Sequence, residues 1–288
     1  DPLGPENKLI VSSGPLSGLM VPGAGKCDWT TKSPLTGGYA SSSLGGHFTA
    51  EMRYAGIDSI IFEGISARPV YLVIDDDKIQ LLDAASYWGR GTIEVEVALK
   101  EKHGEDFQVA VIGPGGENGV LFACINHDYG REAGRGGVGT VMGSKGLKAI
   151  VIRGTKSIPV ANMGEYRKAG MALYRACIEA EGLKPWQTYG TTIVTSWCDE
   201  VGALPTRNFS AGSFEGGSKI YGAVMRDEIV ITDKGCFGCP CPCGKYSHMK
   251  RYGTYVEGPE YETIGMLGSN VGLADIQAVA QANLLCDD

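Results

Sequence analysis

Four cysteines within eight residues constrain this chain more than any other feature of its sequence. They are Cys236, Cys239, Cys241 and Cys243, and glycine and proline residues between them bend the backbone. Thiolates at such short spacings can converge on a soft metal centre, and the C-x2-C-x3-C spacing of Cys236, Cys239 and Cys243 is typical of iron–sulfur ligands. The fourth ligand of such a cluster must come from elsewhere, and Cys241 is predicted to point away.

Two alternatives stay open for this cysteine segment. A zinc site uses the same ligand type, but it would need a second cysteine pair or a histidine pair nearby, and only His248 is close in sequence. A structural or disulfide role is the other alternative. The sequence favours an iron–sulfur cluster over both.

Composition excludes several classes of protein. The formal net charge of −7 does not favour a nucleic-acid partner. No run of 18 apolar residues occurs, so we expect no membrane span. Nine cysteines, an odd number with four bunched together, argue against a secreted disulfide framework and favour a reducing cytoplasm. The chain opens on Asp1 and ends in an uncapped helix at Asp288, so we expect it to be a portion of a longer protein.

The first half of the chain predicts a sheet-rich domain at about 1–155. Short apolar runs separated by Gly-Pro, Pro-Gly and Gly-Gly are typical of antiparallel strands joined by long loops. Helices are expected at 47–55 and at 92–103, where apolar residues follow a helical period. The expected strands are 8–12, 19–21, 27–30, 39–41, 58–64, 70–74, 78–82, 108–112, 120–125 and 148–152. Many short strands with few helices predict an α+β fold.

The composition changes near residue 156, and the remaining 156–288 predict a mainly helical domain that carries the cysteine segment. Helices are expected at 162–182, 259–268 and 274–286, and 184–225 is predicted to form loops with short helices. No internal repeat is visible.

A second informative stretch runs from Arg131 to Gly146. Arg131 and Arg135 lie four residues apart among glycines that expose backbone N–H groups, a combination suited to a ligand that bears phosphates. Walker spacing is absent, and so is the acidic residue of a dinucleotide fingerprint. A turn-rich connection is the simpler alternative, and an Arg-Gly-Gly segment for single-stranded RNA is a weaker one.

Two further segments are candidates for binding or catalysis. The glycine-rich loop 36–47 runs into a helix whose N-terminus could hold an anion, although an ordinary surface loop is the simpler interpretation. Past the cysteines, Glu257, Glu260 and Glu262 surround a Gly-Pro turn. Glu262 could act as a general acid or base beside a metal cofactor, or it could simply favour a helix N-terminus.

Taken together, these stretches resemble the tungsten-containing aldehyde ferredoxin oxidoreductases. The resemblance runs along the whole chain and is specific because all the motifs occur in order. The motifs are Asp1-Pro2-Leu3-Gly4-Pro5-Glu6-Asn7, Thr31-Lys32-Ser33-Pro34-Leu35-Thr36-Gly37, Tyr54-Ala55-Gly56-Ile57-Asp58, Ile112-Gly113-Pro114-Gly115-Gly116-Glu117-Asn118, Ala133-Gly134-Arg135-Gly136-Gly137-Val138-Gly139, the cysteine motif and Glu257-Gly258-Pro259-Glu260-Tyr261-Glu262.

The resemblance implies a tungsten ion held by two pterin cofactors (tungstopterin), with magnesium bridging the pterin phosphates, beside a 4Fe-4S cluster. The sheet-rich domain would form the base for the pterins. The resemblance implies Glu262 as the active-site acid and Cys236, Cys239 and Cys243 as cluster ligands. The residues implied at the pterin and phosphate groups are Lys26, Ser43, Gly45, Arg131, Ala133, Gly134, Arg135 and Asp287.

This chain departs from the family pattern at several positions. Lys26 and Ser43 stand where the family often has Arg and Asn, and lysine keeps the charge without the bidentate fork. Glu132 is out of pattern for a loop that contacts an anionic cofactor. Gln281 and Leu284 replace a Glu-x-x-His pair that binds a metal at a dimer interface in some members, so we expect no such metal here. The resemblance implies that the fourth cluster cysteine and a catalytic histidine lie beyond residue 288.

The function implied by the resemblance is oxidation of an aldehyde to a carboxylate. Electrons would leave through the cluster to ferredoxin or a partner subunit, and an oligomer is compatible with this function. A related enzyme on the same scaffold, such as the tungsten subunit of a benzoyl-CoA reductase, is an alternative. A cluster-only electron-transfer module and a zinc-stabilised binding domain are alternatives from other classes.

Overall fold

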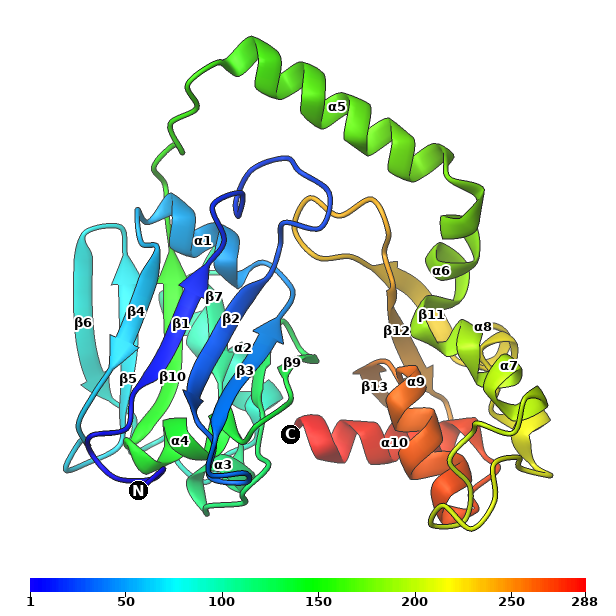
Figure 1. Cartoon of the computed structure of the whole chain (residues 1–288). Helices are drawn as coiled ribbons and strands as arrows, with labels where there is room; N and C mark the ends of the chain where they lie inside the picture. The colour runs from blue at the N-terminus through cyan, green and yellow to red at the C-terminus, as the bar shows by residue number, and fades with distance from the viewer. The chain divides into compact units, whose positions relative to one another are not determined.

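The computed structural model describes residues 1–288, which form two compact units (Figure 1). The first unit comprises Asp1–Met171 together with two short later segments, Cys236–Cys239 and Asp287–Asp288. The second unit comprises Ala172–Gly235 and Pro240–Cys286. The cysteine motif is therefore divided, because Cys236 and Cys239 pack with the first unit and Cys243 packs with the second.

The first unit contains a four-stranded antiparallel sheet in the order β3-β2-β1-β4. Its strands are β1 (Leu9–Ser13), β2 (Cys27–Lys32), β3 (Tyr39–Leu44) and β4 (Ser59–Phe62). Side chains alternate across a strand, so Leu9 and Val11 of β1 and Trp29 of β2 all point to one buried face. That face is one wall of the core.

A six-stranded mixed sheet in the order β6-β5-β10-β7-β8-β9 forms the other wall. Its strands are β5 (Val70–Asp75), β6 (Lys78–Asp83), β7 (Gln108–Val111), β8 (Ile125–His127), β9 (Arg131–Ala133) and β10 (Leu147–Arg153). The central strand β10 runs parallel to β5 and antiparallel to β7. Its residues 147–152 are buried on both faces, as expected for a strand covered on two sides.

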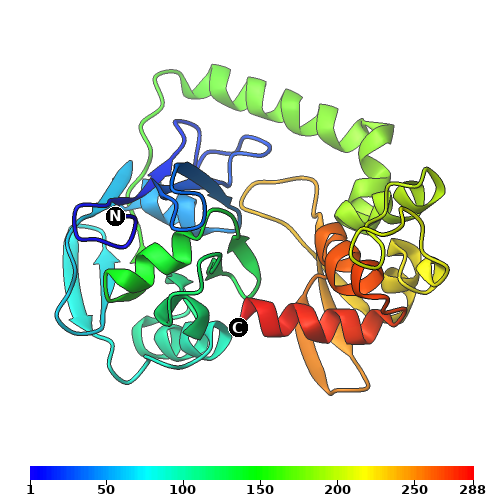
Figure 2. The ribbon, with the colours of Figure 1, turned by 60° about the horizontal axis from the view of Figure 1, so that its bottom comes forward.

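The two faces of β10 belong to two different hydrophobic cores. Ile150 and Ile152 pack in the core that also contains the four-stranded sheet, α1 (Phe48–Tyr54) and α4 (Val138–Ser144). Ala149 and Val151 pack in the core under α2 (Thr92–His103). The short helix α3 (Pro114–Glu117) lies beside α4 (Figure 2). Each large apolar side chain that is fully buried in these cores contributes about 1.5–3 kcal/mol.

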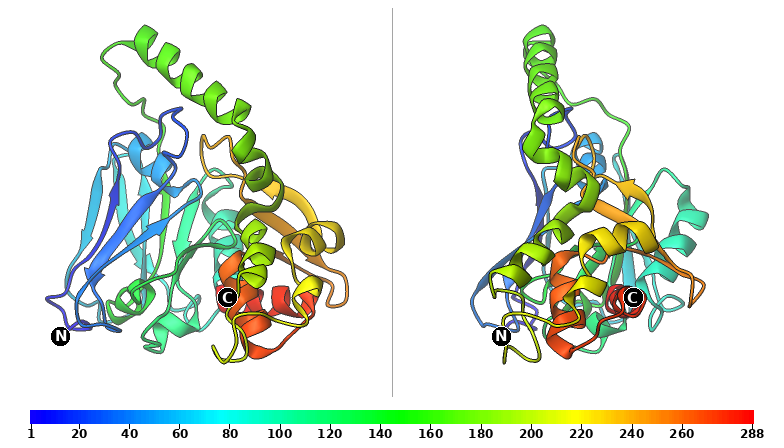
Figure 3. Two further views of the ribbon diagram at one scale, coloured as in Figure 1. Left: turned by 45° about the vertical axis from the view of Figure 1, so that its right-hand side comes forward. Right: turned by 90° about the vertical axis from the view of Figure 1, so that its right-hand side faces the viewer.

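The second unit combines helices with a small antiparallel sheet in the order β11-β12-β13, coloured yellow to orange in Figure 3. The strands are β11 (Val230–Lys234), β12 (Gly244–Met249) and β13 (Thr254–Glu257). The helices are α6 (Lys184–Tyr189), α7 (Val194–Glu200), α8 (Gly222–Glu228), α9 (Tyr261–Thr263) and α10 (Ile276–Asp287). The long helix α5 (Met163–Glu179) begins in the first unit and ends in the second.

The α+β fold and the antiparallel N-terminal sheet are confirmed, and the helix predicted at 92–103 matches α2. The strands expected at 19–21 and 120–124 were wrong, because neither segment is a strand. The half expected to be mainly helical is so, but it also contains the small sheet β11–β13. The stretch 131–146, expected as a glycine-rich loop, contains β9 and α4. No helix is both long enough and apolar enough to cross a membrane.

Candidate functional site

The first end of the cysteine motif fits against two glycines of the first unit. A Cβ atom added to Gly45 would lie 2.9 Å from Cys236 Sγ, and one added to Gly25 would lie 2.9 Å from the carbonyl oxygen of Phe237. The Phe237 N–H donates a hydrogen bond of 3.0 Å to the carbonyl of Gly46. Only residues without a side chain allow this close approach, so the glycines position Cys236.

The side chain of Phe237 anchors the same segment. Its ring makes edge-to-face contacts with His47 and Tyr54, at centroid distances of 6.4 and 6.1 Å. The Cys239 N–H then donates to the Cys236 carbonyl at 3.1 Å, with Gly238 at φ 63°. The chain thus makes a tight turn between the two cysteines of the C-x2-C pair.

A buried histidine that no sequence motif indicates fixes the loop before α1. His127 Nε2 accepts hydrogen bonds from the backbone N–H groups of His47 and Phe48, at 3.0 and 3.1 Å. Its Nδ1 lies 2.8 Å from the carbonyl of Val109 and donates to it. Complete burial lowers the pKa of His127 to about 4, so the ring is neutral at pH 7 and accepts at Nε2. The histidines show no metal-ligand spacing in the sequence, so no signal pointed to this contact.

Strand β9 presents Arg131 and Glu132 in opposite directions. A Cβ atom on Gly45 would lie 3.8 Å from Arg131 Cδ, which places Arg131 beside Gly45 and Cys236. Glu132 instead accepts a hydrogen bond from Asn126 across the β8–β9 pair. The alternation of a strand therefore explains why an acid follows Arg131: its carboxylate faces a protein donor.

The loop after β9 exposes Gly134 and Arg135, while Ala133 is buried in the core. The Arg135 N–H donates to Ser42 Oγ at 3.0 Å, which fixes the backbone and leaves the guanidinium exposed. A Cβ atom added to Gly134 would meet its nearest neighbour, the Glu132 Cβ, at 3.7 Å. Protein packing therefore does not require a glycine at this position.

The later glycines of this stretch serve packing instead. Gly137 has φ 70°, and a Cβ there would lie 2.1 Å from the Leu121 carbonyl oxygen. At Gly139 a Cβ would lie 2.0 Å from the Cys124 carbonyl oxygen. These glycines let α4 pack directly on the backbone of 121–124. Gly137 and Gly139 are therefore required for close packing of α4. Gly134 is not required for packing, so it is the glycine of these three at which a ligand can approach the backbone.

Ser43 and Lys26 lie near the edge of the four-stranded sheet. Ser43 pairs with Asp28 across β3 and β2, and its hydroxyl donates to Asp28 Oδ1 at 2.7 Å. An external ligand would therefore meet the acceptor side of this hydroxyl. Lys26 is exposed and lines a cavity of about 290 Å³ formed by the loop 14–26. Its ammonium is open to an anion.

Asp287 and Asp288 lie at the N-terminus of α2. The Thr92 hydroxyl donates to the Asp287 carbonyl at 2.6 Å, and the Thr92 N–H donates to the Asp288 carbonyl at 3.3 Å. The Ile93 N–H donates to Asp288 Oδ1 at 3.3 Å. A carboxylate is favourable at this end of a helix, so Asp288 is well placed electrostatically, while Asp287 contributes its backbone carbonyl.

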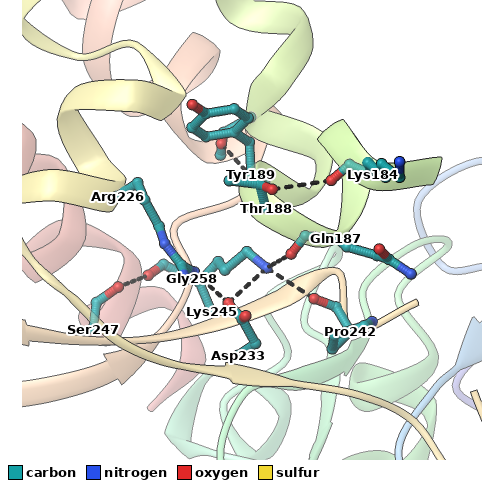
Figure 4. Close-up of polar contacts among 11 residues, drawn as sticks. Lys184, Gln187, Thr188, Tyr189, Arg226, Asp233, Pro242, Lys245, Ser247 and Gly258 are labelled. Atoms are coloured by element: carbon teal, nitrogen blue, oxygen red, sulfur yellow. Dashed lines mark hydrogen bonds and ion pairs between the residues drawn. The ribbon is translucent and has the colours of Figure 1, made fainter. Parts of the chain in front are cut away.

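The second end of the cysteine motif is held by a buried lysine (Figure 4). Lys245 is 2% exposed, and its Nζ donates to the carbonyls of Gln187 and Pro242 at 2.7 and 2.8 Å. It also forms an ion pair of 3.0 Å with Asp233 Oδ1. Burial works to raise the pKa of Asp233, but hydrogen bonds from Arg226 and Lys245 outweigh burial and lower it.

Two contacts from α6 and the residue after it support the same loop. The Gln187 side-chain amide donates to the Pro240 carbonyl at 3.2 Å. Gly190 has φ 62°, and a Cβ there would lie 2.2 Å from the Cys243 carbonyl oxygen. Residues 240–243 are thus fixed through their backbone oxygens, which leaves the Cys243 side chain uninvolved in these contacts.

Of the three acids around the Gly-Pro turn, two are bound to protein groups. Glu257 forms an ion pair of 3.0 Å with Lys234, and Glu260 accepts a hydrogen bond from the Thr191 hydroxyl. Glu262 is exposed on α9, and a π-helical turn, Ile264–Gly268, follows. Turns of this kind occur often at functional sites. Glu262 is therefore the acid that is open to an external ligand.

The structure brings Gly45, Arg131 and Cys236 together in the first unit, whereas Cys243 and Glu262 belong to the second. No three His, Cys, Asp or Glu side chains are arranged to hold a metal ion, and neither unit alone contains all three motif cysteines. Cys236, Cys239 and Cys243 are half-buried. Their donor chemistry fits an iron–sulfur cluster. The exposed Arg135 and the open position at Gly134 fit a phosphate-bearing cofactor.

Comparison with known families gives two matches that together cover most of the chain. Residues 1–154 match the N-terminal domain of the aldehyde ferredoxin oxidoreductases. Residues 168–288 match domains 2 and 3 of the same enzymes.

Individual relatives agree with these matches. The chain is 44% identical over its whole length to a tungsten-containing aldehyde ferredoxin oxidoreductase of Pyrococcus abyssi and 42% identical to that of Thermococcus kodakarensis. It covers 48% of each, so it spans about half the length of these relatives. Among solved structures, the active-site complex BamBC of benzoyl coenzyme A reductase, with 1,5-dienoyl-CoA, aligns with a TM-score of 0.75 at 29% identity, covering 96% of this chain and 46% of that one.

Proposed function

Because the chain belongs to the aldehyde ferredoxin oxidoreductase family, we propose that it is part of a tungsten enzyme that oxidises aldehydes to carboxylates. In this reaction the aldehyde carbon loses two electrons, water supplies the added oxygen, and three protons are released as the carboxylate forms. The electrons pass singly to two molecules of ferredoxin or to a partner subunit. The observation that carries the proposal is the convergence of Gly45, Arg131 and Cys236 from three distant segments.

We propose that a tungsten bis-pterin cofactor binds the first unit and supplies the two-electron redox chemistry. Arg131, Arg135 and Lys26 would be the cations for its phosphates, and an arginine can bind a phosphate with two parallel hydrogen bonds. A magnesium ion would be held by phosphate oxygens of the cofactor rather than by these cations. Gly134 allows close approach of the ligand to the backbone, since nothing in the protein fills its Cβ position. The remaining proposed contacts are Ser43, Gly45, Ala133 and Asp287.

Cys236, Cys239 and Cys243 are the proposed ligands of a 4Fe-4S cluster, which takes electrons one at a time. Gly45 and Gly25 set the position of Cys236, and Lys245 and Gly190 set that of the Cys243 backbone. In this proposal 1–155 is the pterin-binding domain and 156–288 carries the cluster. We also propose a cytoplasmic location, because a chain with nine cysteines, four of them in one metal-binding segment, suits a reducing compartment.

Glu262 is the proposed general acid or base. Its carboxylate is exposed, whereas Glu257 and Glu260 are bound to Lys234 and Thr191. A carboxylate that is not committed to a protein donor can take a proton from the water or aldehyde hydrate that reacts. Gly258, three residues before Tyr261, donates its N–H to the Lys245 carbonyl at 2.7 Å, which holds the turn that leads to Glu262.

The test uses the full-length protein, purified without oxygen, with tungsten, iron and pterin measured on the same sample. We expect tungsten, pterin and iron to be present together, and we expect aldehyde-dependent reduction of a viologen dye. Arg135→Ala should lower the pterin content, because it removes an exposed cation that would bind a cofactor phosphate and leaves the hydrophobic core unchanged. Tungsten-replete protein that reduces no dye with any aldehyde would contradict the proposed reaction.

A second candidate is reduction of an aromatic coenzyme A thioester. The structural similarity to the BamBC complex, at a TM-score of 0.75 over 96% of this chain, supports it. The same purified protein separates the two candidates, because the second predicts oxidation of a reduced dye with benzoyl-CoA and no reaction with aldehydes. We favour the aldehyde reaction because the identity to the aldehyde enzymes is higher, at 44% against 29%.

A further inference from the structure

Lys245 connects the two functional segments of the second unit. Its side chain donates to the Pro242 carbonyl, one residue before Cys243, at 2.8 Å. Its own carbonyl accepts the Gly258 N–H at 2.7 Å, in the turn that leads to Glu262. One residue of β12 thus holds the cysteine loop through its side chain, as Figure 4 shows, and the acid-bearing turn through its backbone carbonyl.

The ammonium of Lys245 is fully used by the protein. An ammonium has three N–H donors, and here three oxygens surround it, from Gln187, Pro242 and Asp233 at 2.7, 2.8 and 3.0 Å. The side chain is 3% exposed. Because this ammonium is buried and held by three oxygens, water screens its charge poorly. It therefore acts on neighbouring charges more strongly than a surface lysine does.

Asp233 neutralises the charge of Lys245 only in part. Asp233 lies opposite Lys245 in the β11–β12 pair, but its side chain is 33% exposed and also binds Arg226. The carboxylate is therefore better screened by solvent than the buried ammonium. Lys245, Arg226 and Asp233 together carry a net positive charge, since two cations share one carboxylate. The buried cation of this group contacts the residue before Cys243.

We infer that Lys245 is a positioning residue that fixes the Cys243 segment and that its buried positive charge raises the reduction potential of the cluster. This inference rests on the proposal that Cys243 is a cluster ligand. Net charge and hydrogen bonding around a cluster are known to set its potential. Reduction adds an electron, and a nearby cation stabilises the reduced state more than the oxidised state.

The experiment compares three variants of the full-length protein by dye-mediated redox titration of the reduced-cluster EPR signal, with iron and sulfide measured on each sample. Lys245→Met keeps an unbranched side chain and removes the charge, so we expect a more negative midpoint potential. Asp233→Asn keeps the side-chain size and removes the negative charge, so we expect a smaller shift to a more positive potential. Opposite shifts are the signature of an electrostatic role.

Lys148→Met is the matched control. Lys148 is also fully buried, donates to the carbonyl of Arg90 at 2.8 Å and pairs with Glu117, but none of its partners adjoins a motif cysteine. We expect this variant to lose stability without a change in potential. If it shifts the potential as Lys245→Met does, the effect comes from general loosening, and the inference is wrong.

The remaining outcomes are also decisive. Equal potentials, or shifts in the same direction, for Lys245→Met and Asp233→Asn at full iron content would overturn the role of Lys245 and leave the cluster proposal intact. If Lys245→Met loses its iron, the positioning role is supported and the Asp233→Asn shift decides the electrostatic part. Wild-type protein without iron or sulfide would overturn the cluster proposal, and the inference with it.

Discussion

The two ends of the cysteine motif are held in physically different ways. Cys236 and Phe237 are fixed by close approach to Gly45 and Gly25 and by backbone hydrogen bonds. The segment before Cys243 is held by an ammonium ion buried among three oxygens, one of them the Pro242 carbonyl, and Gly190 lies close to the Cys243 carbonyl. Steric fit positions an atom without adding a charge, whereas an ion pair positions and adds charge at once. At the first end the contacts that hold Cys236 are therefore separate from the nearby cation Arg131, whereas at the second end Lys245 supplies both the contact and the charge.

The largest effect should come from Glu262, at the end of the segment that Lys245 tethers. Glu262→Gln keeps the shape of the side chain and removes its proton chemistry, so we expect kcat to fall roughly 100- to 10,000-fold. The unfolding midpoint should hardly change, because the side chain is exposed. Steady-state kinetics with an aldehyde and denaturant unfolding measure the two quantities.

Glu260→Gln is the control for this variant, because Glu260 accepts a hydrogen bond from the Thr191 hydroxyl. We expect this change to affect stability more than kcat. A Glu262→Gln enzyme with full activity would show that Glu262 is not the proton-transfer group.

The Cys243 end should depend on steric fit as well as on charge. Gly190 has φ 62° and ψ −148°, a region nearly restricted to glycine, and its Cβ would lie 2.2 Å from the Cys243 carbonyl oxygen. Gly190→Ala should destabilise the protein by about 3 kcal/mol. Denaturant unfolding measures this loss.

Gly182→Ala is the matched change in the same unit, since no atom lies within 4 Å of its Cβ position. We expect it to alter stability by less than about 0.5 kcal/mol. Equal stability of the two variants would mean that the lysine alone holds the loop.

Acid should weaken the two ends in different pH ranges. The pKa of His127, which holds the loop at Gly45 and Gly46, is lowered by burial from 6.5 to about 4. The unfolded chain therefore binds a proton between these values and the folded chain does not, so stability falls as pH drops from 6.5 to 4, by about 3 kcal/mol. The contribution of Asp233, whose pKa is lowered from 3.8, persists above pH 3.8 and is lost only below it.

His127→Gln tests the first of these ranges. A glutamine oxygen can still accept from the N–H groups of His47 and Phe48, but it does not titrate. The variant should be less dependent on pH between 6.5 and 4 than the wild type, as measured by unfolding at a series of pH values. Parallel pH curves for the two proteins would contradict the buried neutral histidine.

Local pattern predicted much of this fold. Short apolar runs separated by Gly-Pro and Gly-Gly turns predicted the antiparallel sheet around β1, and a helical period predicted α2. Helix α4 was missed because Gly139 and Gly143 have poor helix propensity. In the structure a Cβ at either glycine would lie about 2 Å from a carbonyl oxygen of a neighbouring segment, so tertiary packing outweighs propensity.

The candidate site was predictable only in part, for a related reason. The spacing of Cys236, Cys239 and Cys243 is local and can be read from the sequence. The groups that hold these cysteines are not local: Gly45 is separated from Cys236 by most of the chain, and Lys245 reaches Gln187 on α6. A single glycine or lysine carries no pattern of its own, so these contacts became visible only in the folded chain.

Gly45, at the first end, should affect stability less than Gly190 does at the second. A Cβ there would lie 2.9 Å from Cys236 Sγ, and a terminal sulfur can rotate away, so Gly45→Ala should cost about 1 kcal/mol. The displaced thiol should nevertheless bind iron poorly, so iron per chain should fall far more than stability does. Gly38→Ala is the control, because its nearest neighbour lies at 3.8 Å. If Gly45→Ala keeps its full iron content, steric fit does not set the first end, and the contrast with Lys245 fails.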